Sequence, residues 1–431
     1  MPAARRLLPL PVPRGEAVLG LLPLLATALA GRAEAAWHPH AADEAPHPAL
    51  RTGAALGDGE DDEDDPTAFV VATSGSTGTP KGALLPAGAL RASAAATAQR
   101  LGGARDGAVD GAVDGAADGA ADGAADGAAR EQWVLALPAH HVAGLQVLLR
   151  SVRAGTEPVV LPAGPFEAAA FAAATAAATA PRLLTSLVPT QLVRLLDAGG
   201  EAVDALRAHA AVLVGAAATP APLLARARAA GVRVVTTYGS SETCGGCVYD
   251  GVPLSGVGCS LEDERLVVTG PVVARGYRGA PGHPAFGTAP GPGGAGALRR
   301  FRTDDTAALG PGPGGAPVRV LGRVDDLVST GGLKVAPALV EEAVASLPGV
   351  AEVAVVGVDD PQWGQRVVAA VVPAGPRAPT LEQVRAHVGA LLARHAAPRQ
   401  LLVLDALPLR GPGKPDRARL RALAEGVPPA R

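Results

Sequence analysis

Short apolar segments alternate with helical segments along the middle of the chain, and this alternation limits the folds open to it. The apolar runs Gln132–Leu137, Ala211–Val214 and Val232–Thr237 predict strands, whereas the alanine-rich segment Glu167–Ala180 predicts a helix. Another helix is expected to begin at Thr219-Pro220, between the last two of these strands. Such an order is typical of a mostly parallel sheet covered by helices, so we expect an α/β fold.

A second, smaller domain is expected after this region, because 431 residues exceed one ordinary domain. Residues 281–315 are rich in proline and glycine around the island LRRFRTDDTAAL, and a compact pattern follows Gly322. It contains two predicted helices and two predicted strands, at 337–347, 381–394, 352–358 and 367–372. These elements would form a domain of about 100 residues.

Two segments of biased composition lie in the first part of the chain. The acidic run DGEDDEDD at residues 58–65 is expected to be a solvated lead-in to a buried strand at Ala68–Ala72. Residues 106–128 repeat DGAV or DGAA, without a glutamate or a loop spacing suited to calcium. This density of glycine and alanine cannot bury a core, so we predict a low-complexity insertion.

Composition narrows the partners and the compartment. A net charge of -3 and an aromatic content of 3% indicate no nucleic-acid partner. The three cysteines Cys244, Cys247 and Cys259 favour a reducing, cytoplasmic compartment. Prolines interrupt the export-like start, Ala17–Ala30 predicts an ordinary packing helix, and no apolar stretch reaches the roughly 20 residues that span a bilayer, so no integral membrane association is expected. A homo-oligomer is left open.

Lysine is rare in this chain, which makes each lysine a candidate functional residue. Of 38 basic residues only Lys81, Lys334 and Lys414 are lysines, and all three lie in glycine-rich segments. An ammonium reaches a single oxygen as a compact point charge, where the wide guanidinium of arginine does not fit.

The loop TSGSTGTPKG at residues 73–82 carries hydroxyls, glycines and one ammonium, which are ligands for phosphate. It is not a Walker P-loop, because Pro80 precedes Lys81 and Gly82 follows it. The predicted phosphate ligands in it are Thr73, Ser74, Gly75, Ser76, Thr77, Gly78 and Lys81.

This loop resembles the phosphate-binding signature of the adenylate-forming superfamily of acyl-CoA ligases, luciferases and peptide-synthetase adenylation domains. The resemblance implies that fold: a large N-terminal domain of layered β-sheets and helices at residues 1–322, a hinge at 323–326 and a small, mobile α+β C-terminal domain at 327–431. It also implies ATP, Mg2+ and coenzyme A as cosubstrates or cofactor, with a small-molecule carboxylic acid as the acyl donor.

Further segments resemble the superfamily's nucleotide-binding motifs. YGSSET at 238–243 is similar to YGxTE, which implies that Tyr238 stacks on adenine, that Ser241 takes part in nucleotide binding and that Glu242 binds Mg2+ and is catalytic. Gly215 and Ala216 stand where a Gly-Gly adenine loop is usual. FRTDD at 301–305 is similar to YRTGD, so Asp305 would accept the ribose hydroxyls, with Asp304 in place of glycine.

The resemblance continues into the C-terminal part. GRVDD at 322–326 is similar to the GRxDD hinge, which implies that Arg323 meets ribose or phosphate and that Asp325 is the pivot. The glycine loop around Gly332 would line the coenzyme A tunnel after the small domain rotates. LRGPGK at 409–414 is similar to the C-terminal lysine loop, with Pro412 in place of the commoner serine, so Lys414 is the expected catalytic lysine of adenylation.

A narrower resemblance concerns the acid. A very short region before the phosphate loop, together with PAHHVAGLQVLLRS, SLVPTQLVRLL and YGSSETCGGCVYDGVPLSGV, is similar to o-succinylbenzoate CoA ligases of menaquinone biosynthesis in their actinobacterial form. By this resemblance His141 borders the acyl and pantetheine channel and is catalytic, whereas His140 is more simply a core-edge residue. The acid-pocket candidates are Thr190, Gln191, Gly239 and Ser240.

Three alternatives stay open. Another aryl or fatty acyl-CoA ligase would share every catalytic residue named. A carrier-protein loading domain would need a phosphopantetheine partner. A noncatalytic nucleotide-binding relative is suggested by Ala216, Asp304 and Pro412 but opposed by the three lysines and Glu242. The pair Cys244–Cys247 is expected to be floor beside the acyl pocket rather than a zinc or redox site.

Overall fold

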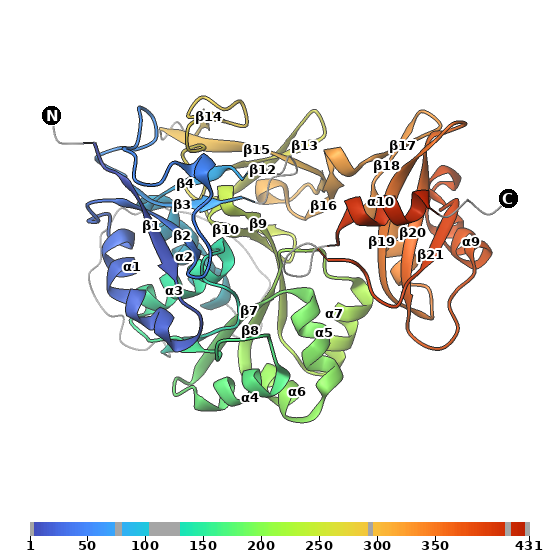
Figure 1. The fold of residues 1–431 in the computed structure, drawn as a ribbon, viewed down its shortest axis with the longest axis horizontal. Coiled ribbons are helices and arrows are strands. Elements are labelled where there is room, and N and C mark those ends of the chain that lie inside the picture. Colours follow the sequence, from blue (N-terminus) through green and yellow to red (C-terminus); the bar gives the residue numbers. More distant parts are fainter. Residues whose placement is uncertain (1–3, 74–79, 103–129, 292–295, 410–414, 427–431) are drawn as a thin grey trace.

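The structure is a computed structural model that describes residues 4–73, 80–102, 130–291, 296–409 and 415–426. A large N-terminal domain built on three sheets lies beside a small C-terminal domain (Figure 1). The two groups of elements expected from the sequence are therefore present, in an α/β arrangement.

The central sheet of the large domain has seven strands in the order β11-β10-β9-β8-β7-β5-β6. Its five strands β5 to β9 run parallel to their neighbours, and β10 and β11 close the edge as antiparallel strands. The strands are β5 (Glu131–Leu135), β6 (Val159–Val160), β7 (Arg182–Leu187), β8 (His209–Val214), β9 (Val234–Ser240), β10 (Gly245–Tyr249) and β11 (Val252–Pro253).

This sheet is buried on both faces, because consecutive side chains of a strand point to opposite sides. Trp133 and Leu213 belong to the core shared with a four-stranded sheet and with α1, α2 and α3. Their chain neighbours Val134 and Val212 belong to the core beneath α4 to α7. The helices are α1 (Leu22–Leu29), α2 (Ala87–Gly102), α3 (Val142–Ala154), α4 (Ala168–Ala177), α5 (Pro189–Ala198), α6 (Gly200–Ala208) and α7 (Ala221–Ala229).

Two further sheets complete the large domain. The first has the order β1-β2-β3-β4, and the second joins β12, β13, β15 and β14 in that order, with β16 paired to β15. Their strands are β1 (Leu7–Val12), β2 (Ala36–Ala41), β3 (Thr67–Ala72), β4 (Gly82–Pro86), β12 (Gly258–Glu262), β13 (Arg265–Thr269), β14 (Phe286–Pro290), β15 (Ala297–Leu309) and β16 (Val318–Arg323).

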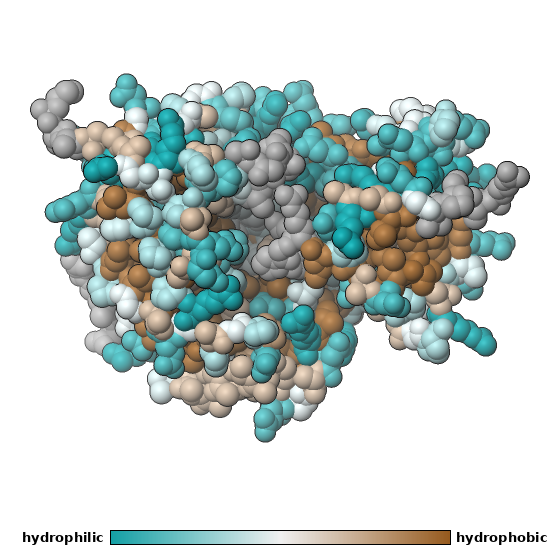
Figure 2. Space-filling model, viewed as in Figure 1, coloured by the Kyte–Doolittle hydropathy of each residue, from teal (hydrophilic) through white to brown (hydrophobic). Residues whose placement is uncertain are grey.

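The small domain is a sheet with helices on its two faces. Its strands have the order β18-β17-β20-β19, with β21 paired to β20. Hydrophobic residues remain visible beside α10 on the face that Figure 2 draws. The elements are β17 (Val328–Thr330), β18 (Leu333–Val335), α8 (Pro337–Ala345), β19 (Val350–Asp360), β20 (Gly364–Pro373), α9 (Leu381–Leu391), β21 (Gln400–Val403) and α10 (Arg417–Glu425).

The strands and helices expected from the sequence are confirmed to within a few residues at each end, for instance as β3, β5, α4, α8 and β20. The helix expected at Ala17–Ala30 is only partly correct, because Gly15–Leu21 forms a 3-10 helix and α1 begins at Leu22. Among the described residues, no helix combines the length and the apolar character needed to cross a bilayer. The repeat at 106–128 lies outside the described residues.

The expectation that the acidic run at 58–65 is solvated is only partly correct. The exposed acidic residues of the run are Asp58, Asp62, Glu63 and Asp64, whereas Glu60 is buried. Glu60 is 2% exposed and forms an ion pair with the guanidinium of Arg278, which is equally well buried. Asp61 pairs with Arg5 at 2.9 Å, and Asp65 accepts the backbone N–H of Gly88 at 2.7 Å. A run of charges in the sequence does not reveal that distant arginines fold onto it.

The pair Glu60–Arg278 joins segments 218 residues apart. Burial raises the pKa of Glu60, but hydrogen bonds from the N–H groups of Gly57 and Gly279 and the charge of Arg278 outweigh it and hold this pKa below 4.5. A depressed carboxyl pKa contributes stability that is present above the unfolded value and is lost as pH falls through the folded value.

We therefore expect Glu60→Gln to lower the free energy of unfolding by about 3–5 kcal/mol at pH 7, because it leaves a buried guanidinium unpaired. Denaturant titrations at pH 7 and well below 4.5 measure this loss, which should shrink at the acidic pH. Asp43→Asn is the matched control, since the Arg14–Asp43 pair is 65% and 66% exposed and should contribute at most about 1 kcal/mol. Equal small losses in both variants would contradict the structural role of Glu60.

Candidate active site

Four loops gather at one edge of the central sheet. The strands β5, β7, β8 and β9 are consecutive parallel neighbours, so their carboxyl ends lie along the same edge. The residues that follow these strands are His141 after β5, Thr190 after β7, Gly215 after β8, and Ser241 and Glu242 after β9. In open α/β sheets ligands bind at this edge. The topology thus brings together four segments that are distant in the sequence.

Tyr238 and Asp305 are joined directly. The hydroxyl of Tyr238, near the end of β9, donates to Oδ2 of Asp305 on β15 at 2.6 Å. Burial and the neighbouring carboxylate of Asp305 raise the pKa of Tyr238, so the phenol keeps its proton. Burial likewise raises the pKa of Asp305, while the Tyr238 hydrogen bond and Arg323 oppose the rise. The bond ties the central sheet to the sheet of β12–β16.

Glu242 lies four residues after Tyr238, in the 3-10 helix Ser241–Thr243, and is buried. It is 7% exposed, and its Oε1 accepts a hydrogen bond from the hydroxyl of Tyr277 at 2.8 Å. Burial and the charge of Glu242 raise the pKa of Tyr277, which therefore remains a donor. The backbone carbonyl of Glu242 also accepts from the N–H of Ala274 at 2.8 Å. The carboxylate is thereby fixed in position.

Glu242 fits a magnesium ligand that relies on substrate for the rest of its coordination. Among the described residues, no group of three or more His, Cys, Asp or Glu side chains is placed to hold a metal ion. Mg2+ commonly takes one or two protein carboxylates and completes its octahedron with water and phosphate oxygens. A single oriented carboxylate beside the predicted phosphate ligand Lys81 meets that requirement.

The loop after β8 is tightly constrained. A Cβ on Gly215 would lie 2.2 Å from Oγ1 of Thr237, so only glycine fits there. Ala216 has φ 67°, in the left-handed region that L-residues with a Cβ adopt at a cost. On β9, a Cβ on Gly239 would lie 1.9 Å from the carbonyl oxygen of Gly245. Close backbone approach therefore dictates Gly215 and Gly239.

Lys81 and Thr73 bracket the hydroxyl-rich loop. The N–H of Thr73 donates to the carbonyl of Lys81 at 2.8 Å, which closes the two ends of the loop. The exposed Lys81 ammonium lies 5.0 Å from the centroid of the Tyr277 ring. Ser74, Gly75, Ser76, Thr77 and Gly78 lie outside the described residues. Tyr277 thus connects the end of the phosphate loop to Glu242.

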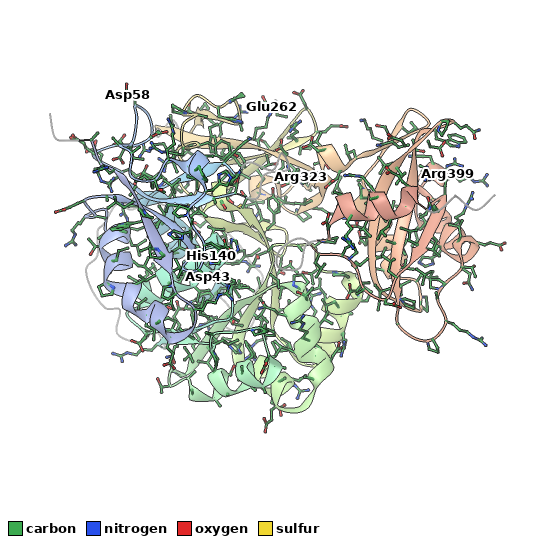
Figure 3. The ribbon with its side chains drawn as sticks, viewed as in Figure 1. Asp43, Asp58, His140, Glu262, Arg323 and Arg399 are labelled. Carbon is green, nitrogen blue, oxygen red and sulfur yellow. The ribbon has the colours of Figure 1, made fainter. Side chains whose placement is uncertain are left out.

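The candidates for the acid pocket differ in what their side chains already do. Exposed His141 precedes α3, and half-buried His140 lies 4.2 Å from it between ring centroids. Burial, then the charge of His141, lowers the pKa of His140 to about 4, and Figure 3 shows it beside Asp43 near the middle of the molecule. Among the described residues, the buried Oγ of Ser240 has no hydrogen-bond partner, so it can serve a ligand.

Thr190 and Gln191 start α5, but only one of them is available. Gln191 Oε1 accepts from the N–H of Val188 at 3.0 Å, and its Nε2 donates to the carbonyl of Ala136 at 2.8 Å. The amide therefore links the start of α5 to the segment after β5, and both of its ends already have a partner within the protein. Thr190 is half-buried at this edge.

Arg323 forms an ion pair with Asp304, which stands in FRTDD where the similar superfamily motif has glycine. Asp304 Oδ2 lies 3.3 Å from Nη2 of Arg323, and its Oδ1 lies 2.5 Å from Nη1 of Arg265. Arg323 is at the side of the large domain that faces the small domain (Figure 3). Asp304 therefore binds an arginine that the resemblance assigns to nucleotide.

Of the remaining C-terminal candidates, Asp325 and Gly332 are described, and they are not brought to this edge. Asp325 is exposed in the 3-10 turn Val324–Asp326. Gly332, with φ 78°, lies in the turn between β17 and β18 on the small domain, away from β9 (Figure 1). Lys414 lies outside the described residues.

The three cysteines are buried in the large domain. Cys244 and Cys247 are fully buried, and all three cysteines are free. Burial raises the pKa of Cys247 to about 12 and that of Cys259 to about 11, so both thiols stay protonated. Cys244 carries its carbonyl toward α3, where Gln146 Nε2 donates to it at 2.7 Å.

Arg150 on α3 is a residue that sequence reasoning missed. It is 5% exposed, its guanidinium lies 5.1 Å from the Trp133 ring centroid, and its Nη2 donates to the hydroxyl of Tyr249 at 3.3 Å. Within the described parts of the chain it has no carboxylate partner, and its Nε has no acceptor. The sequence signal is an arginine within PAHHVAGLQVLLRS, four residues after Gln146 on the same face of the helix.

The family profile "AMP-binding enzyme" matches residues 21–279, and "AMP-binding enzyme C-terminal domain" matches residues 339–414. The chain is 43% identical over 413 residues to a probable 2-succinylbenzoate–CoA ligase of Mycobacterium tuberculosis, covering 95% of this chain and 96% of that protein. It is 29% identical to the 2-succinylbenzoate–CoA ligase of Bacillus velezensis, covering 84% of this chain and 70% of that one.

Among solved structures, the chain resembles o-succinylbenzoate CoA synthetase of Bacillus subtilis in complex with the acyl-adenylate intermediate OSB-AMP. The TM-score is 0.63 at 27% identity, over 83% of this chain and 69% of that chain. ATP-bound MatB of Rhodopseudomonas palustris shares the fold, with a TM-score of 0.73 at 22% identity over 99% of this chain and 90% of that chain.

Glycine substitutions at adjacent positions of the loop after β8 should change the free energy of unfolding in opposite directions. Ala216→Gly should raise the free energy of unfolding by about 0.5–1 kcal/mol, because relief of the left-handed strain exceeds the added entropy of the unfolded chain. Ala217→Gly, at the neighbouring residue without positive φ, should instead lower it by about 0.4–1 kcal/mol. Gly215→Ala should lower it by about 1–3 kcal/mol through its clash with Thr237. Thermal unfolding measures all three, and stabilisation by Ala217→Gly would refute the account.

Proposed function

The chain belongs to the AMP-binding enzyme family, and from that premise we propose that it is an AMP-forming ligase that converts o-succinylbenzoate, ATP and coenzyme A into o-succinylbenzoyl-CoA, AMP and pyrophosphate. This reaction serves menaquinone biosynthesis. The observation that carries the proposal is the short run from Tyr238 to Glu242, which places one carboxylate through the Tyr238 hydrogen bond and another through Tyr277 at one sheet edge. The relative at 43% identity supports this acid.

In the first step a carboxylate oxygen of the acid attacks the α-phosphorus of ATP, and the bond from that phosphorus to the oxygen bridging to the β-phosphate breaks. Two anions approach each other, so the transition state requires fixed positive charge more than proton transfer. Asp305 would accept the ribose hydroxyls beside Tyr238, whose ring would stack on adenine. Thr73 to Gly78, Lys81 and Ser241 would bind the phosphates, Gly215 and Ala216 the adenine edge, and Arg323 ribose or phosphate.

Glu242 would hold Mg2+, which supplies charge neutralisation at the phosphates when bound. Tyr277 keeps that carboxylate oriented by donating to Oε1 at 2.8 Å. Lys414, beyond the described residues, is proposed as the mobile positive charge of this step. The chain's own contribution is therefore orientation and electrostatics.

In the second step the thiol sulfur of coenzyme A attacks the acyl carbonyl carbon and the C–S bond forms. AMP leaves as the C–O bond breaks, and the thiol proton is released to solvent. We propose that residues 323–326 are the hinge, with Asp325 as pivot, and that rotation of the small domain at 327–431 exchanges Lys414 for the loop of Gly332. The position of Gly332 away from β9 is consistent with such an exchange (Figure 1). His141 would border the channel by which the thiol enters. Such gating is a common use of hinges.

The acid has a second carboxylate, and Arg150 is proposed as its partner. Buried charges are ordinarily paired, yet in the part of the chain that the structure describes Arg150 has no carboxylate. Side chains of a helix tilt toward its N-terminus, so Arg150 extends toward Gln146, one turn earlier in α3. Gln146 in turn packs near the backbone of Gly245, because a Cβ built on Gly245 would lie 3.5 Å from it. Tyr249, the hydroxyl partner of Arg150, lies 2.9 Å from a Cβ built on Gly246, which pairs with Gly239. Thr190, Gly239 and Ser240 would line the rest of the pocket.

The proposal places the enzyme in the cytoplasm, where its cosubstrates occur, and three buried thiols that remain free are compatible with a reducing compartment.

The function is tested by pyrophosphate release from purified protein with ATP, Mg2+ and coenzyme A. We expect o-succinylbenzoate to be turned over in preference to benzoate, a medium-chain fatty acid and amino acids. Selective turnover of another acid would show that the protein is an acyl-CoA ligase but would contradict a role in menaquinone biosynthesis. No turnover of any acid, with ATP still bound, would contradict catalysis altogether.

Arg150→Met should raise the KM for o-succinylbenzoate by roughly thirtyfold, corresponding to about 2 kcal/mol for removal of one partner of a buried charge pair. The KM for ATP should change little. Arg150→Lys keeps the charge and should recover part of the loss, and Arg153→Met, on the exposed face of the same helix, is the control. A normal KM in a folded Arg150→Met enzyme would remove Arg150 from the acid pocket.

A further inference from the structure

His283 lies next to Lys81 although 202 residues separate them in the sequence. The segment after Tyr277 folds against the end of the phosphate loop, since the N–H of Arg278 donates to the carbonyl of Gly82 at 2.8 Å. The buried Arg278–Glu60 pair fixes this segment further. As a result Nε2 of His283 stands 3.4 Å from the Lys81 ammonium nitrogen.

The hydrogen bonds of His283 show that this contact joins two donors. The backbone N–H of Ala285 donates to Nδ1 of His283 at 3.2 Å. A neutral imidazole has one lone pair and one N–H, so acceptance at Nδ1 places the proton on Nε2. The direction of the Ala285 N–H is fixed by the backbone, so Nδ1 must be its acceptor. The ammonium of Lys81 can instead rotate toward other acceptors. Nε2–H and the ammonium therefore face a common space as a donor pair.

A pair of donors at this spacing binds an oxyanion. The pair is linked to Glu242, the proposed Mg2+ ligand, through Tyr277. The Tyr277 ring contacts His283 edge-on at 4.9 Å between centroids, and its hydroxyl binds Glu242 at 2.8 Å. The nearby carboxylate of Asp304 does not serve as the acceptor in this structure, since it binds Arg265 and Arg323. Mg2+ held by Glu242 would neutralise charge on the phosphates of ATP, and the donor pair would add positive charge to the same group.

We infer that His283, through Nε2–H, acts with Lys81 to bind the pyrophosphate portion of ATP and stabilise it as the leaving group. The inference rests on the proposed function, because it assumes that ATP occupies the site of Tyr238 and Glu242. It adds a residue outside the superfamily-like motifs. It also predicts selectivity: ligands with a β-phosphate use His283, and AMP does not.

Calorimetric binding of magnesium pyrophosphate, magnesium ATP and AMP to the full-length protein tests the inference without any acid. His283→Phe keeps an aromatic ring against Tyr277 but removes the donor, and should weaken pyrophosphate and ATP binding about tenfold, the value of one hydrogen bond to a charged group. AMP binding should be unchanged. His283→Gln restores an N–H donor and should recover part of the affinity, and His395→Phe in the small domain is the control.

The kinetic counterpart separates the two half-reactions. His283→Phe should raise the KM for ATP in adenylation and leave thioester formation from preformed acyl-adenylate at the wild-type rate. Wild-type affinities in His283→Phe, or equal losses for AMP and pyrophosphate, would overturn the inference and leave His283 as packing for Tyr277. Absence of turnover with every acid, combined with the selective loss of pyrophosphate binding, would reject the proposed function but retain the role of His283.

Discussion

The parallel pairing of β5, β7, β8 and β9 is the constraint on which the site depends. The residues that follow each strand lie at one edge of the sheet. His141, Thr190, Gly215 and Glu242 therefore come together there although they are far apart in the sequence. The sheet is buried on both faces, by α1 to α3 and the β1–β4 sheet on one side and by α4 to α7 on the other. That burial holds the strands in register, because a shift by one residue would move the apolar side chains to the opposite face.

Contacts between residues distant in the sequence attach Asp305, Tyr277 and His283 to this edge. Tyr238 binds Asp305 across the two sheets, and the Glu60–Arg278 pair anchors the segment that carries Tyr277 and His283. Tyr277 then contacts both Glu242 and Lys81. The groups proposed for ribose, metal and phosphate are thereby fixed relative to one another before substrate binds, which is how a site reduces the reorganisation needed in a transition state.

Much of this could be predicted from the sequence because it depends on local patterns. The strand and helix segments follow from apolar periodicity, and the phosphate loop, YGSSET and FRTDD are recognisable as short motifs. What the sequence did not reveal depends on contacts between distant residues. Glu60 was expected to be solvated because its partner Arg278 is 218 residues away. Gln191 was a ligand candidate, although its amide already bonds Val188 and Ala136. Arg150 lies within PAHHVAGLQVLLRS, but no role could be assigned to it from that segment, and His283 belongs to no motif.

The central claim is that these distant residues form one site for an acyl-adenylate. A crystal structure of the protein with a stable sulfamoyladenosine analogue of the o-succinylbenzoyl-adenylate tests it most directly. We expect the ribose on Asp305, the adenine against Tyr238 and the loop of Gly215, and the second carboxylate directed at Arg150. An analogue bound with its ribose away from Asp305, or at another edge of the central sheet, would contradict the account.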